Sequence, residues 1–372
     1  MKFCFLGNFS EALKGQTPGG GELQVALLAK ALALKGHEVI IIAPGSQENF
    51  ITAEGVKLIT VPDWNKGLRG VRLFLYRIPG LKKMLIEQNA DYYYVRMRSY
   101  IHLLPFWASK KTKGKFIIAT AHDLDVSSFS KKFKYEYKPK FNLFRLLTVD
   151  LPADLVFNYL LKNANYVILQ HSGQRINLNS VKGKIVIFPN IFDFSNIIPV
   201  KNPANDYFIH PGALNILKGT QNLYNLINSL DKKIPIVIVG QPTDKKSEKL
   251  YKKLQKLENV VLKGRLNHKD TIQLIANAKA LINTSNFEGF PNIFLEAWAC
   301  GVPVISLNVN PGQIFNKYNL GTYCEGDLNK MKKSIELFKK DSFEKEKLIS
   351  YVLKFHDLSM AGDRFLNIIN NP

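Results

Sequence analysis

Short apolar segments that alternate with helical segments are the feature that most limits the folds open to this chain. Residues 38–43 are rich in β-branched side chains and stop at Pro44, whereas residues 22–35 carry apolar side chains at helical spacing. Near-continuous apolar strands separated by helices are typical of parallel sheets with helices on both faces. The pattern therefore predicts an α/β protein.

The strand segments fall into two series. The first is expected at residues 2–6, 38–43, 56–61, 91–95, 115–121, 166–169 and 184–188, and the second at 207–210, 235–239, 259–262, 281–284, 303–306 and 321–324. For a chain of 372 residues, two domains are the default expectation. We predict two doubly wound, Rossmann-like parallel-sheet lobes, residues 1–198 and 199–356, facing across a cleft at the carboxyl ends of their strands. A helix over residues 357–370 is expected to pack back on the first lobe.

The net charge and the number and spacing of the cysteines limit the classes of protein to which the chain can belong. The net charge is +21, and many lysines lie between residues 110 and 145. Such a basic face attracts anionic lipid head groups, phosphorylated substrates or nucleic acid, although a solvated lysine-rich surface explains it equally well. The three scattered cysteines favour neither a disulfide framework nor a zinc site. We expect a cytoplasmic protein, with peripheral association at the inner face of the membrane.

The segment from Glu288 to Glu296 carries the clearest chemistry. Glu288 lies in a Gly-rich turn after an apolar run, Pro291 is suited to the first helical position, and Asn292 and Glu296 share one face of the helix that follows. The backbone amides at a helix start bind anions. The unit could hold a sugar hydroxyl at Glu288, a phosphate at the amides and a ribose diol at Glu296, which together describe a nucleotide sugar.

The same segment resembles the GT4-type retaining glycosyltransferases of GT-B fold (glycosyl transferase group 1). Their pattern E-G-F-P-N-x-x-x-E-A-x-A-x-G-x-P-V-I is matched from Glu288 through Ile305. The resemblance implies that Glu288 holds hydroxyls of the transferred sugar and that Glu296 takes the ribose hydroxyls. It also implies that backbone amides approach the sugar or the diphosphate at Gly289, Phe290, Asn292 and Ile293.

Lys218 is the cation that the resemblance places on the donor diphosphate. It falls at the lysine of the family pattern G-R-x-x-x-x-K-G, and a cation near a helix start requires an anion because the helix dipole is positive there. Ala213 occupies the position of the family's arginine. This departure implies that the diphosphate is bound more weakly, or that another cation binds it.

Gly20, Gly21, His122 and Arg265 enter through the resemblance, and Asp123 is added as a neighbouring polar residue. Gly20 and Gly21 belong to a Gly-rich loop that the family places near the donor phosphate and the acceptor. His122 follows an expected strand, where the family often has a histidine that contacts the sugar, and Asp123 is a second polar candidate. Arg265 lies in a segment that resembles the one beside the nucleobase.

The resemblance implies retaining transfer of a hexose-type sugar from a nucleotide-sugar donor to a glycan or lipid-linked acceptor, in surface polysaccharide biosynthesis. Glu288, His122 and Lys218 would be the catalytic residues, without a metal or other cofactor. A GT-B nucleotide-sugar epimerase is an alternative, whereas a phosphorylase would need a pyridoxal phosphate lysine that we cannot locate. A nucleic-acid binder is suggested only by the charge, and no nucleic-acid partner is expected because the known binding motifs are lacking. The sugar, the nucleobase and the acceptor stay open.

Overall fold

The chain forms two compact units in a computed structural model. The model describes residues 1–16, 19–45, 48–68, 71–178, 180–197, 206–339 and 342–370. Unit 1 comprises Met1–Val126, Phe141–Ile191 and Leu358–Pro372, and unit 2 comprises Ser127–Lys140 and Phe192–Asp357. The boundary that the sequence places between residues 198 and 199 lies outside the described residues, and each unit is described by itself.

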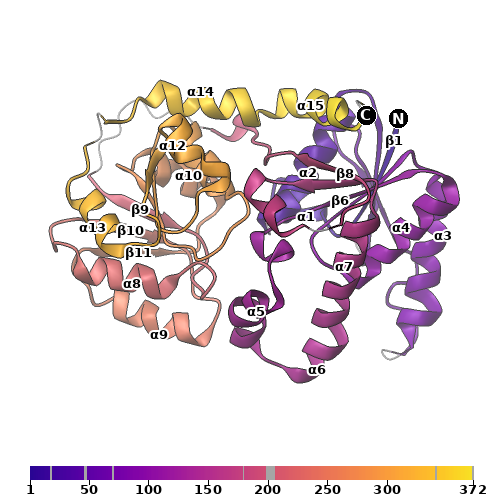
Figure 1. Cartoon of the computed structure of the whole chain (residues 1–372), viewed down its shortest axis with the longest axis horizontal. Helices are drawn as coiled ribbons and strands as arrows, with labels where there is room; N and C mark the ends of the chain where they lie inside the picture. Colours follow the sequence, from indigo (N-terminus) through magenta and orange to yellow (C-terminus); the bar gives the residue numbers. More distant parts are fainter. Residues whose placement is uncertain are drawn as a thin grey trace. The chain divides into compact units, whose positions relative to one another are not determined.

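Unit 1 is built on an eight-stranded sheet (Figure 1). Its order is β3 (Phe50–Ile51), β4 (Lys57–Thr60), β2 (Glu38–Ala43), β1 (Lys2–Leu6), β5 (Tyr92–Arg96), β6 (Lys115–Ala119), β7 (Tyr166–Leu169) and β8 (Lys184–Ile187). All neighbours pair in parallel except β3 and β4. The expected parallel strands of the first series are confirmed. The edge strand β3 was not predicted, because two residues are too short to show a periodic pattern.

Helices cover both faces of this sheet. Along β1, Phe3 and Phe5 enter one apolar cluster while Cys4 and Leu6 enter another, as the alternation of strand side chains requires. The first cluster includes side chains of α2 (Gly20–Leu34) and α15 (Leu358–Asn370), and the second those of α3 (Ile78–Gln88), α4 (Leu103–Thr112) and α7 (Leu151–Asn163). The short helix α1 (Ser10–Leu13) packs Leu13 against the first cluster, whereas neither cluster includes a side chain of α6 (Leu143–Arg145).

Unit 2 contains a six-stranded sheet in which all neighbours are parallel. Its order is β11 (Val260–Gly264), β10 (Ile236–Val239), β9 (Phe208–Pro211), β12 (Leu281–Asn283), β13 (Val304–Ser306) and β14 (Gly321–Tyr323). Its helices are α5 (Phe129–Lys132), α8 (Thr220–Ser229), α9 (Lys245–Leu254), α10 (His268–Ala276), α11 (Asn292–Ala299), α12 (Ile314–Tyr318), α13 (Leu328–Glu336) and α14 (Lys345–His356). Separate apolar clusters again lie on the two faces. The second expected series of parallel strands is thereby confirmed.

The strand order shows where each sheet is open to a ligand. In unit 2 the chain winds outward from β9 in one direction and from β12 in the other, and in unit 1 it does so from β1 and β5. The loops after such a pair leave in opposite directions, and a crevice forms at the carboxyl ends of the two strands. Binding sites are therefore expected after β9 and β12, and after β1 and β5.

Candidate functional site

The crevice of unit 2 contains an ion pair between Lys218 and Glu288. Lys218 lies in the loop after β9 and Glu288 in the loop after β12, so residues 70 positions apart in sequence meet where the strand order reverses. The Lys218 Nζ contacts Glu288 Oε1, and 38% of the lysine side chain stays exposed. The pair is therefore accessible to an incoming ligand.

Short hydrogen bonds hold the Glu288 carboxylate in place. The Ser285 hydroxyl donates to Glu288 Oε1 at 2.8 Å and accepts from Asn283 Nδ2 at 3.2 Å. Asn308 fixes the Ser285 backbone by donating to its carbonyl oxygen at 3.1 Å. Glu288 itself is buried. The carboxylate thus has one oxygen in a defined position, an arrangement suited to accepting hydrogen bonds from sugar hydroxyls.

A glycine brings Lys218 close to β12. Gly219 adopts φ of +68°, and a Cβ there would lie 1.9 Å from the Thr284 carbonyl oxygen, so no larger residue fits without rearrangement. Lys218 is further fixed because its carbonyl accepts from the Thr284 hydroxyl at 3.2 Å and its amide donates to Asn215 Oδ1 at 2.9 Å. Helix α8 begins at Thr220, so the lysine lies just ahead of the helix rather than on it.

Glu296 has a partner that the sequence did not indicate. His268 Nε2 lies 3.2 Å from Glu296 Oε1, and the hydrogen bond and negative charge of Glu296 raise the pKa of His268. His268 is the first residue of α10, and Asn267 caps that helix by accepting from the Asp270 amide at 2.8 Å. A sequence search for polar residues at helix starts in the second lobe would have found His268, although its contact with Glu296 depends on the fold.

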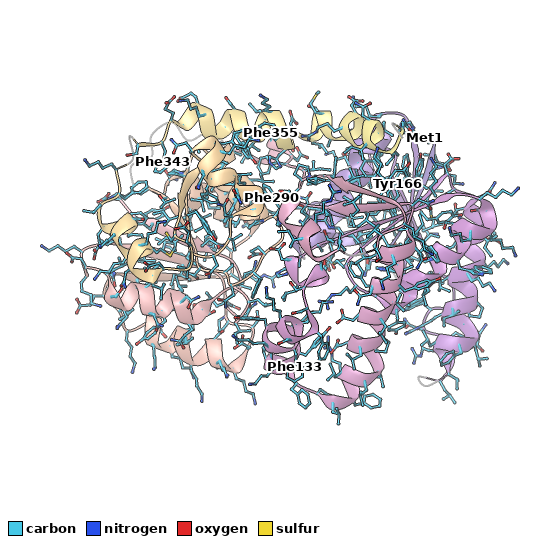
Figure 2. The ribbon with its side chains drawn as sticks, in the orientation of Figure 1. Met1, Phe133, Tyr166, Phe290, Phe343 and Phe355 are labelled. Carbon is cyan, nitrogen blue, oxygen red and sulfur yellow. The ribbon has the colours of Figure 1, made fainter. Side chains whose placement is uncertain are left out.

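The loop between Glu288 and Glu296 differs in detail from the prediction. Pro291 is the residue before the helix and not its first helical residue, because its ψ of 123° is extended, and α11 begins at Asn292. Phe290 is buried with its ring 4.9 Å from that of His356, as part of the unit 2 core (Figure 2). Its side chain therefore serves packing, and only its backbone is suited to contact a ligand.

The other residues predicted to bind the sugar donor differ in how far they are buried. Gly289 is buried, and Asn292 and Ile293 are half-buried in the first turn of α11, whose amides point toward the preceding loop. Arg265 is exposed after β11, which is separated from β9 by β10. It is the only arginine between residues 206 and 357, so no other arginine of that range replaces the one missing at Ala213.

The crevice of unit 1 contains the glycine loop and His122. A Cβ on Gly21 would lie 3.1 Å from Met97 Sδ and 3.8 Å from Ala121 Cβ, so the start of α2 approaches the loops after β5 and β6. Gly20 is the first residue of α2 and exposed. His122 Nδ1 accepts from the Leu124 amide at 3.1 Å, which leaves the proton of a neutral ring on Nε2. The structure thus brings Gly21 and the His122 loop together.

A buried ionic network fixes the His122 loop. Asp125 Oδ2 accepts from the amides of Ala121 and His122 at 2.7 and 3.0 Å, while Oδ1 accepts from Arg98 Nε at 3.0 Å. Arg98 also donates to Asp154 of α7 at 2.7 Å. Asp123 has a different partner, because its Oδ1 lies 2.9 Å from His171 Nε2. The sequence analysis missed Arg98, Asp125 and Asp154 as site residues because the contact joins three distant parts of the chain, two loops and helix α7.

Two family descriptions match adjoining parts of the chain. "Glycosyltransferase Family 4" matches residues 18–195, and "Glycosyl transferases group 1" matches residues 193–355. The chain belongs to this family of glycosyltransferases. The expected family and the expected two-sheet fold are therefore confirmed.

Two curated relatives are glycosyltransferases as well. An uncharacterized glycosyltransferase of Methanocaldococcus jannaschii is 27% identical over 42% of this chain and 43% of its own length. One component of the human phosphatidylinositol N-acetylglucosaminyltransferase is 26% identical over 86% of this chain and 65% of its own length. The chain thus spans less than two thirds of the length of these relatives.

Solved structures of similar fold cover the whole glycosyltransferase chain. Sucrose-phosphate synthase from Thermosynechococcus elongatus has a TM-score of 0.75 at 16% identity, covering 100% of this chain and 98% of its own. HepE from Anabaena, in complex with UDP and glucose, has a TM-score of 0.70 at 16% identity and covers 100% of both chains. At such identity the likeness establishes the fold.

Two further features of the described residues concern membrane spans and metal ligands. None of the described helices combines the length and the apolar character that crossing a bilayer would require. Within the same part of the chain, histidine, cysteine and carboxylate side chains do not gather in a group of three or more that could hold a metal ion.

Proposed function

We propose that this glycosyltransferase transfers a hexose-type sugar, with retention, from a nucleotide-sugar donor to a glycan or lipid-linked acceptor in surface polysaccharide biosynthesis. The observation that carries the proposal is the Lys218–Glu288 pair, which lies at the reversal of strand order in unit 2, with Glu288 in the loop that leads into α11. A cation, a fixed carboxylate and helix-start amides are the three groups that a sugar diphosphate requires.

Each group has a role in the proposed donor complex. Lys218 exchanges its bond with Glu288 for one with the diphosphate, and Glu288 then accepts hydrogen bonds from hydroxyls of the sugar. The first-turn amides of α11, including those of Asn292 and Ile293, approach the diphosphate, while Glu296 accepts from the ribose hydroxyls. HepE, solved with UDP and glucose, supports a donor of this class. Gly20 and Gly21 of unit 1 would leave room for donor phosphate or acceptor.

The proposed chemistry requires charge stabilisation more than a protein nucleophile. The bond between the anomeric carbon and the diphosphate oxygen breaks, and the acceptor oxygen bonds to the same face of that carbon. The acceptor proton passes to the leaving phosphate. Lys218 and the α11 amides stabilise the negative charge that develops on the leaving group, so we propose that the reaction requires no metal. His122, with its Nε2–H available, donates a hydrogen bond to a sugar hydroxyl.

A thermal-shift screen against UDP, GDP, ADP, CMP and their sugars tests the donor class, because a ligand of the native state raises the unfolding temperature with its occupancy. We expect one nucleotide family to stabilise the wild type and Glu288→Gln to lose the extra stabilisation by the sugar. Absence of a shift with every nucleotide would overturn the proposal. Sugar conversion without an added acceptor would instead indicate the epimerase.

A further inference from the structure

One segment of the chain belongs to unit 2 although the chain on both sides of it belongs to unit 1. This segment, Ser127–Lys140, begins directly after the turn Asp123–Val126 of the His122 loop and returns to unit 1 at Phe141. We call it the crossing segment. The strands before and after it, β6 and β7, pair with each other in parallel, and such a pair needs one crossover helix, which α7 provides. The crossing segment is therefore additional to what the sheet of unit 1 requires.

The crossing segment is helical and rich in aromatic side chains. Helix α5 continues into a wide helical turn, Phe133–Tyr137. Three rings of the segment gather together, since that of Phe129 lies 6.1 Å from Phe133 and 6.2 Å from Tyr137 (Phe133 is labelled in Figure 2). Tyr135 lies between the latter two in sequence, and its ring has a partner outside the segment.

The partner of Tyr135 is Phe287, the residue that precedes Glu288. The two ring centroids lie 4.7 Å apart and the ring planes meet at 68°, which is an edge-to-face arrangement. Phe287 is half-buried, yet it belongs to neither apolar cluster of the described part of unit 2. Its ring is therefore covered by the crossing segment and not by the core.

The backbone on both sides of Phe287 belongs to the donor site. Asn286 donates from its amide and from its side chain, at 2.8 and 2.6 Å, to carbonyl oxygens of the loop that carries Lys218. On the other side, Glu288 accepts from the Ser285 hydroxyl at 2.8 Å. Because Phe287 and Glu288 share a peptide bond, a displacement of Phe287 changes the position of the Glu288 carboxylate relative to Lys218.

The crossing segment has a fixed starting point. Asp125, in the turn directly ahead of it, is buried, accepts from two backbone amides of the His122 loop and is bound by Arg98. A side chain can position another residue only when its own backbone is held in place. The network around Arg98 provides this support for the residues that lead to Tyr135.

We propose that Tyr135 is a positioning residue for sugar transfer, whose ring fixes Phe287 and so holds the Glu288 carboxylate where the donor sugar binds. This inference rests on the proposed function for the role of Glu288. Among the described residues, the Tyr135 hydroxyl has no hydrogen-bond partner, so the ring provides the contact. Loss of the ring should therefore impair the orientation of the sugar while the nucleotide still binds.

Amide hydrogen exchange tests the contact in the absence of any ligand. The Asn286 amide donates to the Leu217 carbonyl oxygen in the wild type, and in Tyr135→Ala it should exchange about two- to tenfold faster, because an edge-to-face ring pair is lost. Tyr135→Phe keeps the ring and should exchange as the wild type does. Unchanged exchange in Tyr135→Ala would overturn the proposal.

Rates of transfer measure the consequence for the reaction. Tyr135→Ala and Phe287→Ala should each lower kcat by about tenfold, with unchanged thermal stabilisation by the free nucleotide. The double variant should lose no more than either single variant, because both break the same contact. Losses that multiply in the double variant would show that the two rings act independently. An equal loss in Tyr135→Phe would show that the hydroxyl contacts the substrate, and either result would overturn positioning through the ring.

Tyr159→Ala is the matched control. It also removes a tyrosine ring from an edge-to-face pair, in this case with Phe106 in the helix layer of unit 1, at 5.8 Å and 87°. This variant should change neither the exchange of the Asn286 amide nor the rate of transfer. A decrease in transfer equal to that of Tyr135→Ala would show a general effect of losing a ring pair and would contradict the proposal.

The outcomes separate this inference from the proposed function. Faster exchange at Asn286 in Tyr135→Ala, in a protein that no nucleotide stabilises, would leave the loop contact supported and contradict the donor assignment. Stabilisation of the wild type by a nucleotide, together with wild-type transfer in Tyr135→Ala, would leave the donor assignment supported and overturn the role of Tyr135.

Discussion

The two units share the same parallel-sheet architecture, but the ion pairs that hold their crevice loops differ in exposure. The pairs in unit 1 are buried, whereas the cation in unit 2 is partly exposed. In unit 1, Arg98 is 13% exposed and bridges two buried aspartates, one of which also accepts two backbone amides. In unit 2, Lys218 contacts Glu288 while more than a third of its side chain faces solvent. The first arrangement fixes a backbone, whereas the second leaves a cation able to change partners.

This difference assigns the Arg98 network to the stability of the fold and the Lys218–Glu288 pair to ligand binding. A buried charge without its partner is strongly destabilising, so the network around Arg98 is a structural element that orders the His122 loop. The Lys218–Glu288 pair contributes less to stability, because water can replace the partly exposed lysine and the buried Glu288 also accepts a hydrogen bond from Ser285. The comparison predicts that the same type of substitution will strongly destabilise unit 1 but leave unit 2 folded and inactive.

Arg98→Met should have the largest effect. It leaves Asp125 and Asp154 buried without their cation, and we expect a loss of about 3–5 kcal/mol in the free energy of unfolding. Urea denaturation measures the change, and Arg145→Met, which breaks the exposed pair with Asp150, should lose less than about 1 kcal/mol. Equal losses in the two variants would contradict the assignment of a buried network.

Lys218→Met should affect sugar transfer far more than stability. The free energy of unfolding should fall by about 1–2 kcal/mol, less than in Arg98→Met, because the buried Glu288 loses its cation but keeps the hydrogen bond from Ser285. Transfer from the nucleotide sugar should fall about a hundredfold or more because the leaving diphosphate loses its cation. Rates of sugar transfer and urea melts of the same preparation give both quantities. Lys233→Met is the matched control, and a variant that retains wild-type transfer would remove Lys218 from the site.

Ser285→Ala should have a smaller effect, centred on the position of Glu288. The carboxylate loses one hydrogen bond from a neutral donor to a charged acceptor, which corresponds to about 1.5 kcal/mol, or about a tenfold decrease in transfer. The loss should appear with the nucleotide sugar and not in the affinity for the free nucleotide, because Glu288 is assigned to the sugar. Equal weakening for both ligands would show that Ser285 supports the loop in general.

The smallest expected effect is a pH dependence from His268. Its pKa is raised by the hydrogen bond and charge of Glu296, so the protonated ring stabilises the folded state. This contribution is fully present below the unfolded-state pKa of about 6.5 and is lost as the pH rises through the higher folded value. Because solvent screens a partly exposed pair, it stays below about 1 kcal/mol.

Urea melts of the wild type and of His268→Gln between about pH 5 and pH 9 measure this contribution. The variant should be less stable than the wild type at the acid end, and the difference should shrink toward the alkaline end. A difference that does not vary with pH would mean that the Glu296 contact is not ionic in solution.

Short sequence patterns were sufficient to predict most of the strands and helices. Strand β2 and helix α2 were predicted because β-branched runs and helical apolar spacing are properties of a few neighbouring residues. The motif between Glu288 and Glu296 could likewise be found without a structure, since the turn, the helix start and both carboxylates are adjacent in the chain. The error at Pro291 was one position, because proline is compatible with both the cap and the first turn.

The sequence by itself therefore determined the family, the two parallel sheets and the identity of Glu288, Glu296 and Lys218 as residues of interest. Only the tertiary structure decided which groups meet them: Lys218 with Glu288, and His268 with Glu296. The same holds for the Arg98 network. Local sequence determines hydrogen bonding and side-chain periodicity along an element, whereas contacts between distant segments depend on strand order and register, which bring together residues that no short pattern connects.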